Sequence, residues 1–415
     1  MNGYVIIGNS AAAVGAVEAI RRVNHSIPIT MISDEPHSVY SRPLISHLLS
    51  GELKADRMYY RPKDFYEKNR TRALLGRCVT KVHFEEKSVQ LEKGEKIAYD
   101  RLLIATGGKP FIPKMEGLDT AGVYTFTKWG DTQKILSDLK EVRKAVIIGG
   151  GLIGLKAVEA LAARKIEVTV VELADHILSL NMDRAASSIL ERILEKKGVR
   201  LFTSNTVEAI LGNGRVESVR LADGKMLKAQ MVIVAIGVVP NVQPFRGTSL
   251  HIKKGIVVNE RTETNIPDVF AAGDVAEGVD SITGRLQLNA TWLNAIRQGW
   301  IAGFNMVGKK ISYLRNVRIN IANLFELPFA SAGLIRGVSG HHEEVTDMGG
   351  HHYRKLVFEG NLLVGTVLIG DVSDVGVLTS FIERRELFPK LKEEFQKDPY
   401  SRGLLSIRRR ILCQH

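Results

Sequence analysis

Cysteine is nearly absent from this 415-residue chain, which contains only Cys78 and Cys413. Two thiols exclude a disulfide framework and any cysteine-rich iron–sulfur or zinc site. The chain also lacks an apolar run approaching the roughly 18 residues that a membrane span needs. A predicted strand starts at Tyr4, which leaves no room for a signal peptide. These absences predict a cytoplasmic protein that does not enter a membrane.

Acidic residues are outnumbered, with 45 Asp and Glu against 57 Lys and Arg, so the formal net charge is +12. No basic–aromatic motif accompanies this charge, so nucleic acid is not the expected partner. An acidic protein partner fits the charge better. The length exceeds what one hydrophobic core supports and predicts two or three domains.

A glycine-rich turn between two apolar strands is the strongest pattern present. Residues 145–148 read as a buried strand, a helical pattern with one apolar face follows the turn, and residues 167–171 read as a second strand. The turn between them has the complete G-x-G-x-x-G spacing: Gly149-Gly150-Gly151-Leu152-Ile153-Gly154. A strand, turn, helix and strand in this order predict a dinucleotide-binding unit.

Each glycine of this turn has a separate expected role. Gly149 allows the tight turn, Gly151 lets the backbone approach a pyrophosphate, and Gly154 lets the helix pack on the strand. The helix N-terminus offers free N–H groups to the phosphates. Glu172 ends the second strand and can accept both hydroxyls of an adenosine ribose. A 2′-phosphate would be repelled there, so NAD(H) is expected rather than NADP(H).

A second unit of this kind opens the chain. Strand 4–7 leads into a degenerate fingerprint whose small residues still permit close approach: Gly8-Asn9-Ser10-Ala11-Ala12-Ala13. A helix to about residue 23 and a strand at 29–33 follow, ending at Asp34 and Glu35, which compete for one ribose-binding role. Two units imply two nucleotides. One is mobile NAD(H), and the other is a resident partner that takes its hydride, most simply FAD.

Shorter motifs follow these units in a fixed order: Tyr40-Ser41-Arg42-Pro43, Ala105-Thr106-Gly107, Ala235-Ile236-Gly237 and Ala272-Gly273-Asp274. With them, the chain resembles the FAD/NAD-dependent pyridine nucleotide oxidoreductases of the glutathione-reductase superfamily over residues 1–385. Within that superfamily it is most similar to the branch of NADH–rubredoxin reductases, oxygenase-coupled ferredoxin reductases and NADH-nitrite-reductase flavin domains.

This resemblance implies FAD contacts for five parts of the chain. Asp34 binds the adenosine ribose, and Arg42 reaches the adenine–pyrophosphate half. Lys109 flanks the FAD, and Asp274, an exposed acid at the end of an expected strand from Val269, bonds the ribityl–pyrophosphate region. Trp292 falls where the family places backbone near the flavin ring, although packing is its simpler role. Surface cations remain the alternative for Arg42 and Lys109, and a helix N-cap for Asp274.

The same resemblance predicts the fold class, α/β with two Rossmann-like domains of the three-layer ββα type and a small α+β C-terminal domain. The expected FAD-binding domain is split between residues 1–113 and 244–309, around an NAD(H)-binding domain at 114–243. The C-terminal domain covers 310–385, with a hairpin at 353–368 and a helix at 371–385. A basic tail at 386–415 contains Arg408-Arg409-Arg410.

The cysteines of the superfamily's disulfide reductases and peroxidases are missing after the first acidic strand. Electrons are therefore expected to leave directly from the flavin. Many members place a Lys near the flavin, paired with a Glu after the second fingerprint; here these positions are His47 and Lys156. We hypothesise that Lys156 supplies the cation from the other side, with His47 as a polar neighbour. A solvent-facing lysine is the alternative.

The expected function is an FAD-dependent NADH oxidoreductase that passes electrons to an acidic ferredoxin- or rubredoxin-like carrier, or the reverse. Two alternatives stay open: an NADH oxidase using oxygen or a small acceptor, and an FAD-bound assembly subunit of a larger redox complex. A homodimer is compatible with the sequence. No metal site is predicted, because a solvated loop explains the histidine cluster His341, His342, His351 and His352 better than a zinc or nickel site does.

Overall fold

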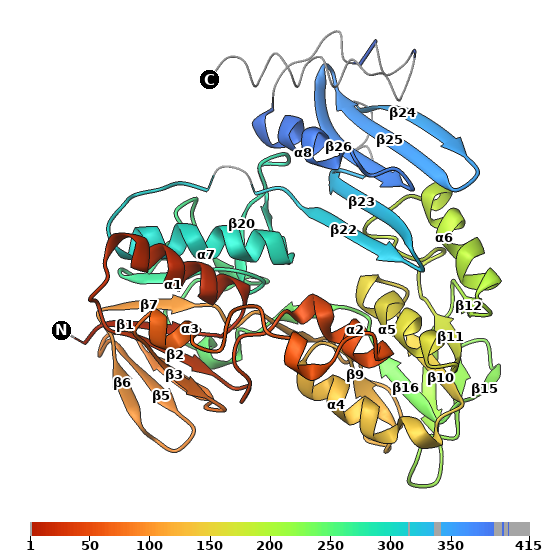
Figure 1. The fold of residues 1–415 in the computed structure, drawn as a ribbon, viewed down its shortest axis with the longest axis horizontal. Helices are drawn as coiled ribbons and strands as arrows, with labels where there is room; N and C mark the ends of the chain where they lie inside the picture. Colours follow the sequence, from red (N-terminus) through yellow and green to blue (C-terminus); the bar gives the residue numbers. More distant parts are fainter. Residues whose placement is uncertain (1, 314–315, 336–341, 386–391, 394–396, 398–415) are drawn as a thin grey trace. The chain divides into compact units, whose positions relative to one another are not determined.

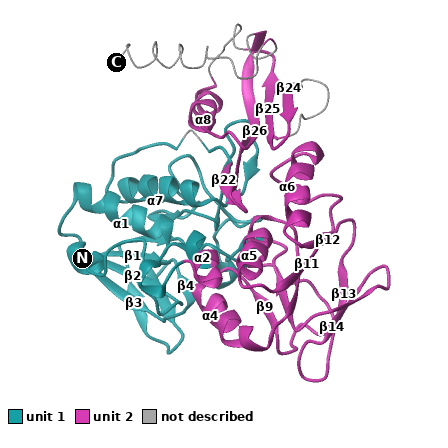
Figure 2. Ribbon diagram, turned by 45° about the vertical axis from the view of Figure 1, so that its right-hand side comes forward, with its two compact units in different colours: residues 1–45, 53–109, 238–318 teal, residues 46–52, 110–237, 319–415 magenta. Residues whose placement is uncertain are grey.

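The computed structural model describes residues 2–313, 316–335, 342–385, 392–393 and 397. The chain forms two compact units (Figure 2). Unit 1 comprises residues 1–45, 53–109 and 238–318, and unit 2 comprises 46–52, 110–237 and 319–415. Each unit is assembled from separate stretches of sequence, so its core depends on contacts between distant segments. His341 and most of the tail, including Cys413 and the three arginines, lie outside the described residues.

A five-stranded parallel sheet forms the centre of unit 1, in the order β19-β7-β1-β2-β3. Its central strands are short apolar runs buried on both faces, as expected for a parallel sheet covered on two sides. The strands are β1 (Tyr4–Ile7), β2 (Ile29–Ser33), β3 (Thr71–Leu75), β7 (Arg101–Ile104) and β19 (Val269–Ala271).

Helices α1 (Ala11–Val23) and α7 (Trp292–Met306) lie side by side on one face of this sheet (Figure 1). Glycines allow the close approach: a Cβ on Gly299 would lie 2.0 Å from the Ala12 carbonyl oxygen, and one on Gly303 would lie 2.4 Å from that of Ala16. Helix α7 begins at Trp292 and continues to Met306. Its first turn is capped by Thr291.

An antiparallel meander covers the opposite face, so the layers are meander, parallel sheet and helices, as predicted. The meander strands are β4 (Val79–His83), β5 (Ser88–Leu91) and β6 (Lys96–Ala98). Cys78 lies in the connection before β4 and is exposed. The remaining elements of unit 1, apart from β8 at its boundary, are α3 (Phe65–Lys68), β17 (Val238–Pro240), β18 (Ile256–Val257), β20 (Ala276–Val279) and β21 (Leu286–Gln287).

Unit 2 repeats this plan around a second parallel sheet, in the order β12-β11-β10-β16-β9. Apolar side chains of one face pack against a three-stranded meander, and helix α5 packs on the sheet as well. The elements are β9 (Val123–Thr125), α4 (Trp129–Asp138), β10 (Lys144–Ile148), α5 (Leu152–Ala163), β11 (Glu167–Val171), α6 (Arg184–Lys196), β12 (Arg200–Phe202), β13 (Val207–Leu211), β14 (Ser218–Leu221), β15 (Met226–Lys228) and β16 (Met231–Val234).

The short helix α2 (Ile45–Ser50) belongs almost entirely to unit 2, although the chain on both sides of it belongs to unit 1. Arg164, the C-cap residue of α5, donates from Nε to the Leu49 carbonyl oxygen at 3.0 Å. Leu49 itself is fully buried. This contact holds α2, and His47 on it, to the dinucleotide unit. The predicted plan of a continuous segment 1–113 did not include this.

The C-terminal part of unit 2 is a five-stranded antiparallel sheet, in the order β22-β23-β26-β25-β24, with helix α8 (Val375–Arg384) against it. The expected hairpin is present around Gly360, which has a φ of +59°. The helix starts four residues later than the predicted 371. The strands are β22 (Ile319–Leu324), β23 (Leu327–Gly333), β24 (His342–Gly349), β25 (His352–Glu359) and β26 (Leu362–Ile369). Among the described residues, no helix is long and apolar enough to cross a membrane.

Candidate functional site

The first glycine turn lies between β1 and α1 in unit 1. Gly8 has a φ of +131°, and a Cβ there would lie 2.1 Å from the Ala105 carbonyl oxygen, so only glycine fits. Ser10 occupies the N-cap of α1, and the first turn of this helix carries no acidic side chain. The first amides of a helix have no intrahelical partner and attract an anion. This turn, with Ala11 and Ala12, therefore has the geometry of a pyrophosphate site.

A charged network follows strand β2. Glu35 is buried and accepts hydrogen bonds from the Tyr40 hydroxyl at 2.7 Å and from Arg42 Nη2 at 2.5 Å. Arg42 lies next to Pro43 in a short 3-10 helix, with its side chain 34% exposed. It is therefore not the solvated surface cation that the sequence left open. Asp34 stands exposed at the end of β2, so the two competing acids occupy different environments.

Asp274 faces the same guanidinium. Burial raises the pKa of the Asp274 carboxyl, and the charge of Arg42 offsets this only in part. The sequence predicted an exposed acid here, with a helix N-cap as the alternative. Both are wrong, because the side chain is half-buried and Thr291 caps the nearest following helix. A half-buried carboxylate with an unfavourable environment is the kind of group that a ligand hydroxyl or an amide stabilises.

Backbone contacts hold the two remaining turns of unit 1. Thr106 Oγ1 donates to the Asn241 carbonyl oxygen, and Asn241 N–H donates to that of Gly107, both at 2.9 Å. Gly273, with a φ of +81°, donates its N–H to Gln298 Oε1 at 2.8 Å. These bonds fix the carboxyl ends of β7 and β19 beside the first glycine turn, where open α/β sheets bind their ligands.

Lys109 and Trp292, the two remaining residues predicted for the first site, differ from each other in exposure. Lys109 is exposed on β8 (Gly108–Pro110), which pairs with β17. Trp292 begins α7, packs against the core of unit 1, and makes an edge-to-face contact with Tyr60 at a ring-centroid distance of 5.2 Å. Packing therefore accounts for part of the Trp292 surface.

The second glycine turn, in unit 2, joins β10 to α5. A Cβ on Gly149 would lie 2.6 Å from the Ala235 carbonyl oxygen, and one on Gly154 would lie 2.0 Å from that of Gly149. A Cβ on Gly151, in contrast, would meet nothing within 4 Å. Gly149 and Gly154 are therefore required by the fold, whereas the space at Gly151 is open. Leu152 and Ile153 begin α5, whose first amides point into this turn region.

Glu172 follows β11 and folds back onto the turn. Its carboxylate accepts hydrogen bonds from the Gly150 N–H at 2.5 Å and the Ala174 N–H at 2.8 Å. These hydrogen bonds position the Glu172 carboxylate beside the glycine turn. Gly237, just beyond β16, has a φ of +121° and open space around it. Together these residues form a cradle with one fixed carboxylate at the carboxyl edge of the sheet.

The two residues predicted to act at the flavin each have a carboxylate partner of their own. Lys156 Nζ lies 2.7 Å from Glu159 Oε2, and His47 Nδ1 lies 2.7 Å from Glu52 Oε2. The Lys156 side chain is only 25% exposed, which is not the solvent-facing alternative. Helix α5 begins at Leu152, so Lys156 lies in its second turn. Sequence reasoning missed Glu159, although its i+3 spacing from Lys156 was a usable signal.

The described histidines of the cluster do not all lie together. In the β24–β25 ladder His342 pairs with Glu359, whereas His352 pairs with Gly349 at the opposite end. The length of the eight-residue strand β24 therefore separates His342 from His352. His352 lies 3.3 Å from Asp347. Within the described part of the chain, no group of three or more His, Cys, Asp or Glu residues could hold a metal ion.

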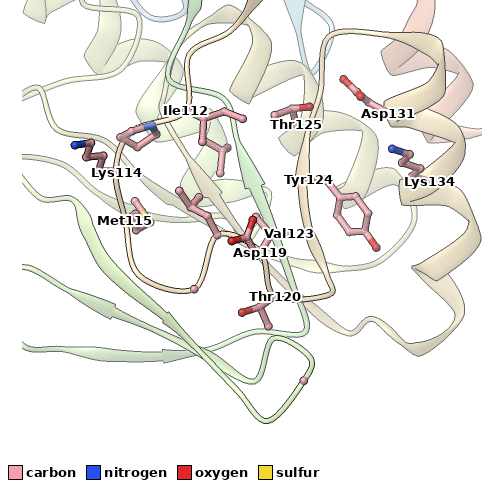
Figure 3. A pocket seen from close by; sticks show the side chains of 15 residues that line it. Ile112, Lys114, Met115, Asp119, Thr120, Val123, Tyr124, Thr125, Asp131 and Lys134 are labelled. Atoms are coloured by element: carbon pink, nitrogen blue, oxygen red, sulfur yellow. The ribbon is translucent and has the colours of Figure 1, made fainter.

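A groove of about 860 Å³ lies beside edge strand β9 and was not predicted (Figure 3). Lys114 and Lys134 lie at opposite ends of it, and Asp131, which also lines it, accepts hydrogen bonds from backbone N–H groups at the start of α4. It contains none of the glycine-turn residues. The groove is therefore separate from the dinucleotide cradle of the same unit.

Two dinucleotide cradles, each at the carboxyl edge of a parallel sheet, define an oxidoreductase class that combines a bound nucleotide with a second, exchangeable one. The chain belongs to the pyridine nucleotide-disulphide oxidoreductase family, whose model matches residues 2–299. Residues 319–386 match the model described as the rubredoxin NAD+ reductase C-terminal domain.

Individual relatives agree with this placement. The chain is 32% identical over 383 residues to a nitrite reductase [NAD(P)H] of Bacillus subtilis, covering 92% of this chain but 47% of that protein, so it spans about half of that relative. It is 29% identical to the epsilon subunit of an NADH-dependent phenylglyoxylate dehydrogenase of Aromatoleum evansii, covering 99% and 97% of the two chains. The structure of NADH:rubredoxin oxidoreductase from Clostridium acetobutylicum matches with a TM-score of 0.76 and 25% identity, over 93% and 96% of the chains.

Proposed function

We propose that this protein is an FAD-dependent NADH oxidoreductase that passes electrons to an iron–sulfur or rubredoxin-type carrier protein, or runs in the reverse direction. The observation that carries the proposal is the geometry of the second cradle. Its glycine turn has open space at Gly151, and the neighbouring Gly150 N–H donates a hydrogen bond to the Glu172 carboxylate. When bound, FAD accepts the hydride of NADH and returns the electrons to the acceptor. The domain plan proposed from the sequence assigns FAD to unit 1 and NADH to the dinucleotide part of unit 2.

The residues of unit 1 fit FAD by the chemistry of their donors. The backbone amides at the start of α1, in the turn formed by Gly8, Ser10, Ala11 and Ala12, suit the pyrophosphate. The exposed carboxylate of Asp34 suits the adenosine ribose. Arg42, held by Glu35, supplies a positioned cation. We assign Asp274 with Gly273 to the ribityl–pyrophosphate region, and Lys109, Trp292 and the turn Ala105-Thr106-Gly107 to the edge of the site.

The residues of unit 2 fit NADH in the same way. Gly149, Gly151, Leu152 and Ile153 present backbone to the pyrophosphate, with Gly237 on the facing turn. Glu172 orients the ribose and disfavours a 2′-phosphate by charge repulsion. No thiol is assigned a role, because exposed Cys78 is the only cysteine among the described residues.

Lys156 is the residue that we propose to tune the flavin, with His47 as its polar neighbour. Because Glu159 neutralises Lys156, the two residues should act in opposite directions. Lys156→Met is expected to lower the flavin midpoint potential and Glu159→Gln to raise it, each by on the order of 30 mV for a two-electron couple. Anaerobic redox titration measures both values, and the shift should disappear in a Lys156→Met/Glu159→Gln double variant. Unchanged potentials in both single variants would reject the role.

Anaerobic flavin bleaching tests the main proposal. Mixing the purified protein with NADH should bleach the flavin absorbance near 450 nm, and NADPH should act at least about 100-fold more slowly because of Glu172. Adding an oxidised rubredoxin or a ferredoxin should then restore the absorbance. The protein contributes orientation of the two rings and exclusion of water, and no side-chain nucleophile is needed.

The carrier half of this experiment also tests the expected acidic partner. The rate of reoxidation should fall steeply with added salt, since the chain carries a net charge of +12. Fast oxygen uptake with NADH alone, and no response to either carrier, would favour an NADH oxidase instead. A single subunit or a homodimer is compatible with each outcome, and we propose neither over the other.

A second candidate function is that of an FAD-bound subunit in a larger redox complex. The near-complete coverage shared with the phenylglyoxylate dehydrogenase epsilon subunit favours it. In that case the electron acceptor is a protein held permanently at the surface. Stable copurification with other subunits from the native source would support this candidate, while full activity of the isolated chain with a soluble carrier would count against it.

A further inference from the structure

Within unit 2, the C-terminal sheet contacts the dinucleotide part through a buried lysine. Lys355 Nζ lies 2.9 Å from Asp183 Oδ2 and 2.8 Å from Glu344 Oε1, and its side chain is only 4% exposed. The Tyr353 hydroxyl donates to the same Asp183 oxygen at 2.7 Å. One carboxylate on the dinucleotide side therefore collects two donors from β25. Buried polar groups that are paired in this way fix geometry, because separating them leaves charges without partners.

Asp183 also ends the segment that contacts the coenzyme cradle. It caps helix α6, with Oδ1 accepting the Ala186 N–H at 3.0 Å. The segment before it begins at Glu172 and returns to the glycine turn, where Leu178 N–H donates to the Gly150 carbonyl oxygen at 2.9 Å. Leu178 has a φ of +53°, which a branched residue adopts only when its surroundings hold it there. Residues 173–183 thus connect the glycine turn to the C-terminal sheet.

A second contact joins the sheet to helix α5. The β22–β23 turn places two non-glycine residues at positive φ, Phe325 at +45° and Glu326 at +70°. The Phe325 N–H donates to Glu159 Oε1 at 2.7 Å, while the other oxygen of Glu159 binds Lys156. Lys197 lies 5.8 Å from the Phe325 ring centroid. The helix that starts at the glycine turn is therefore tied to a strained hairpin.

We propose that the C-terminal sheet preorganises the NADH cradle of unit 2, with Lys355 and Glu159 as its positioning residues. This inference rests on the proposed function, because it assumes that the cradle binds NADH. Neither residue touches the open space at Gly151. They act by holding residues 173–183 and helix α5 in place, which removes part of the ordering cost that binding would otherwise include. The C-terminal sheet thereby contributes to coenzyme affinity without contacting the coenzyme.

Steady-state kinetics on the FAD-loaded full chain test the proposal. Lys355→Met should raise KM for NADH by about 5- to 10-fold, with kcat on ferricyanide within about twofold, since only coenzyme binding is affected. Titration with ADP-ribose, which needs no electron transfer, should show the same loss of affinity. Hydrogen exchange at residues 173–183 should become faster. Lys228→Met, an exposed lysine on β15, is the matched control and should change none of these.

The kinetic and binding results distinguish a failure of this inference from a failure of the proposed function. Unchanged KM, ADP-ribose affinity and exchange in Lys355→Met would overturn the inference while leaving the enzyme assignment intact. If the unmodified protein bound neither NADH nor ADP-ribose, the proposed function itself would fail. Should Lys355→Met lose its fold, Tyr353→Phe keeps the test, because it removes one hydroxyl and leaves the charges paired. It should give a smaller KM increase in the same direction.

Discussion

Gly151→Val should raise the KM for NADH by about 100-fold, equivalent to ~2.7 kcal/mol of lost binding free energy, and leave the fold intact. A Cβ at this position would meet nothing within 4 Å, and the backbone φ of −80° suits any L-residue. The new side chain would instead occupy the space that the pyrophosphate requires. Valine is a poorer N-cap than glycine, which costs about 0.5–1 kcal/mol and lowers Tm by ~2–4 °C.

Gly154→Ala is the matched comparison. Its Cβ would lie 2.0 Å from the Gly149 carbonyl oxygen, so the backbone must shift and stability should suffer together with binding. Circular dichroism melts and ADP-ribose titration separate the two effects. The assignment of the second turn to NADH would be wrong if Gly151→Val bound ADP-ribose as tightly as the unmodified chain.

Arg42→Ala should weaken FAD binding by about 100-fold, so that the protein is purified with little flavin. The substitution removes the cation proposed for the pyrophosphate half and leaves Glu35 buried without its 2.5 Å partner. Breaking a buried ion pair from one side costs about 3–5 kcal/mol, and the 34% exposure of Arg42 places this case near the lower end. Arg42→Lys keeps the positive charge but loses the planar guanidinium with its two donor groups. Its FAD affinity should lie between that of the unmodified protein and that of Arg42→Ala.

Asp274→Asn should increase the stability of the FAD-free protein, whereas Arg42→Ala should decrease it. The folded-state pKa of Asp274 is raised by burial, so its ionisation costs stability as pH rises above the unfolded-state value near 4. At pH 7 the FAD-free variant should therefore melt a few degrees higher. The gain should vanish near pH 3, where both forms are neutral. FAD affinity should nevertheless fall, and an unchanged affinity would contradict the proposed contact.

Several features of the fold followed directly from local sequence. Short apolar runs with β-branched residues predicted β1, β2, β10 and β11, because strands covered on both faces need no polar alternation. The glycine turns were also predictable from local sequence, because Gly8 and Gly149 occupy backbone positions where a side chain would clash with a neighbouring carbonyl oxygen. The order of the motifs then indicated the family, which the match over residues 2–299 shows.

Other features depended on neighbours that are distant in sequence. The environment of Asp274 differed from the exposed acid expected after a strand, because it is partly buried and faces the charge of Arg42, which lies more than 200 residues away along the chain. Helix α2 could not be assigned to unit 2 without the Arg164–Leu49 contact. His342 and His352 lie at opposite ends of the β24–β25 ladder, although the sequence places them near one loop.

By itself, the sequence determined the chemistry available to this protein: two dinucleotide turns, Glu172 as the acid of the second, and no cysteine in the segment directly beyond the first acidic strand. These are properties of short segments, where spacing and residue type decide the backbone conformation. Tertiary structure alone decided the partners of the charged groups. Glu35 holds Arg42, Glu159 accepts the Phe325 N–H across 166 residues, and Lys355 reaches Asp183 across 172 residues. Pairing between charges depends on which surfaces the fold brings together, and local pattern does not encode that.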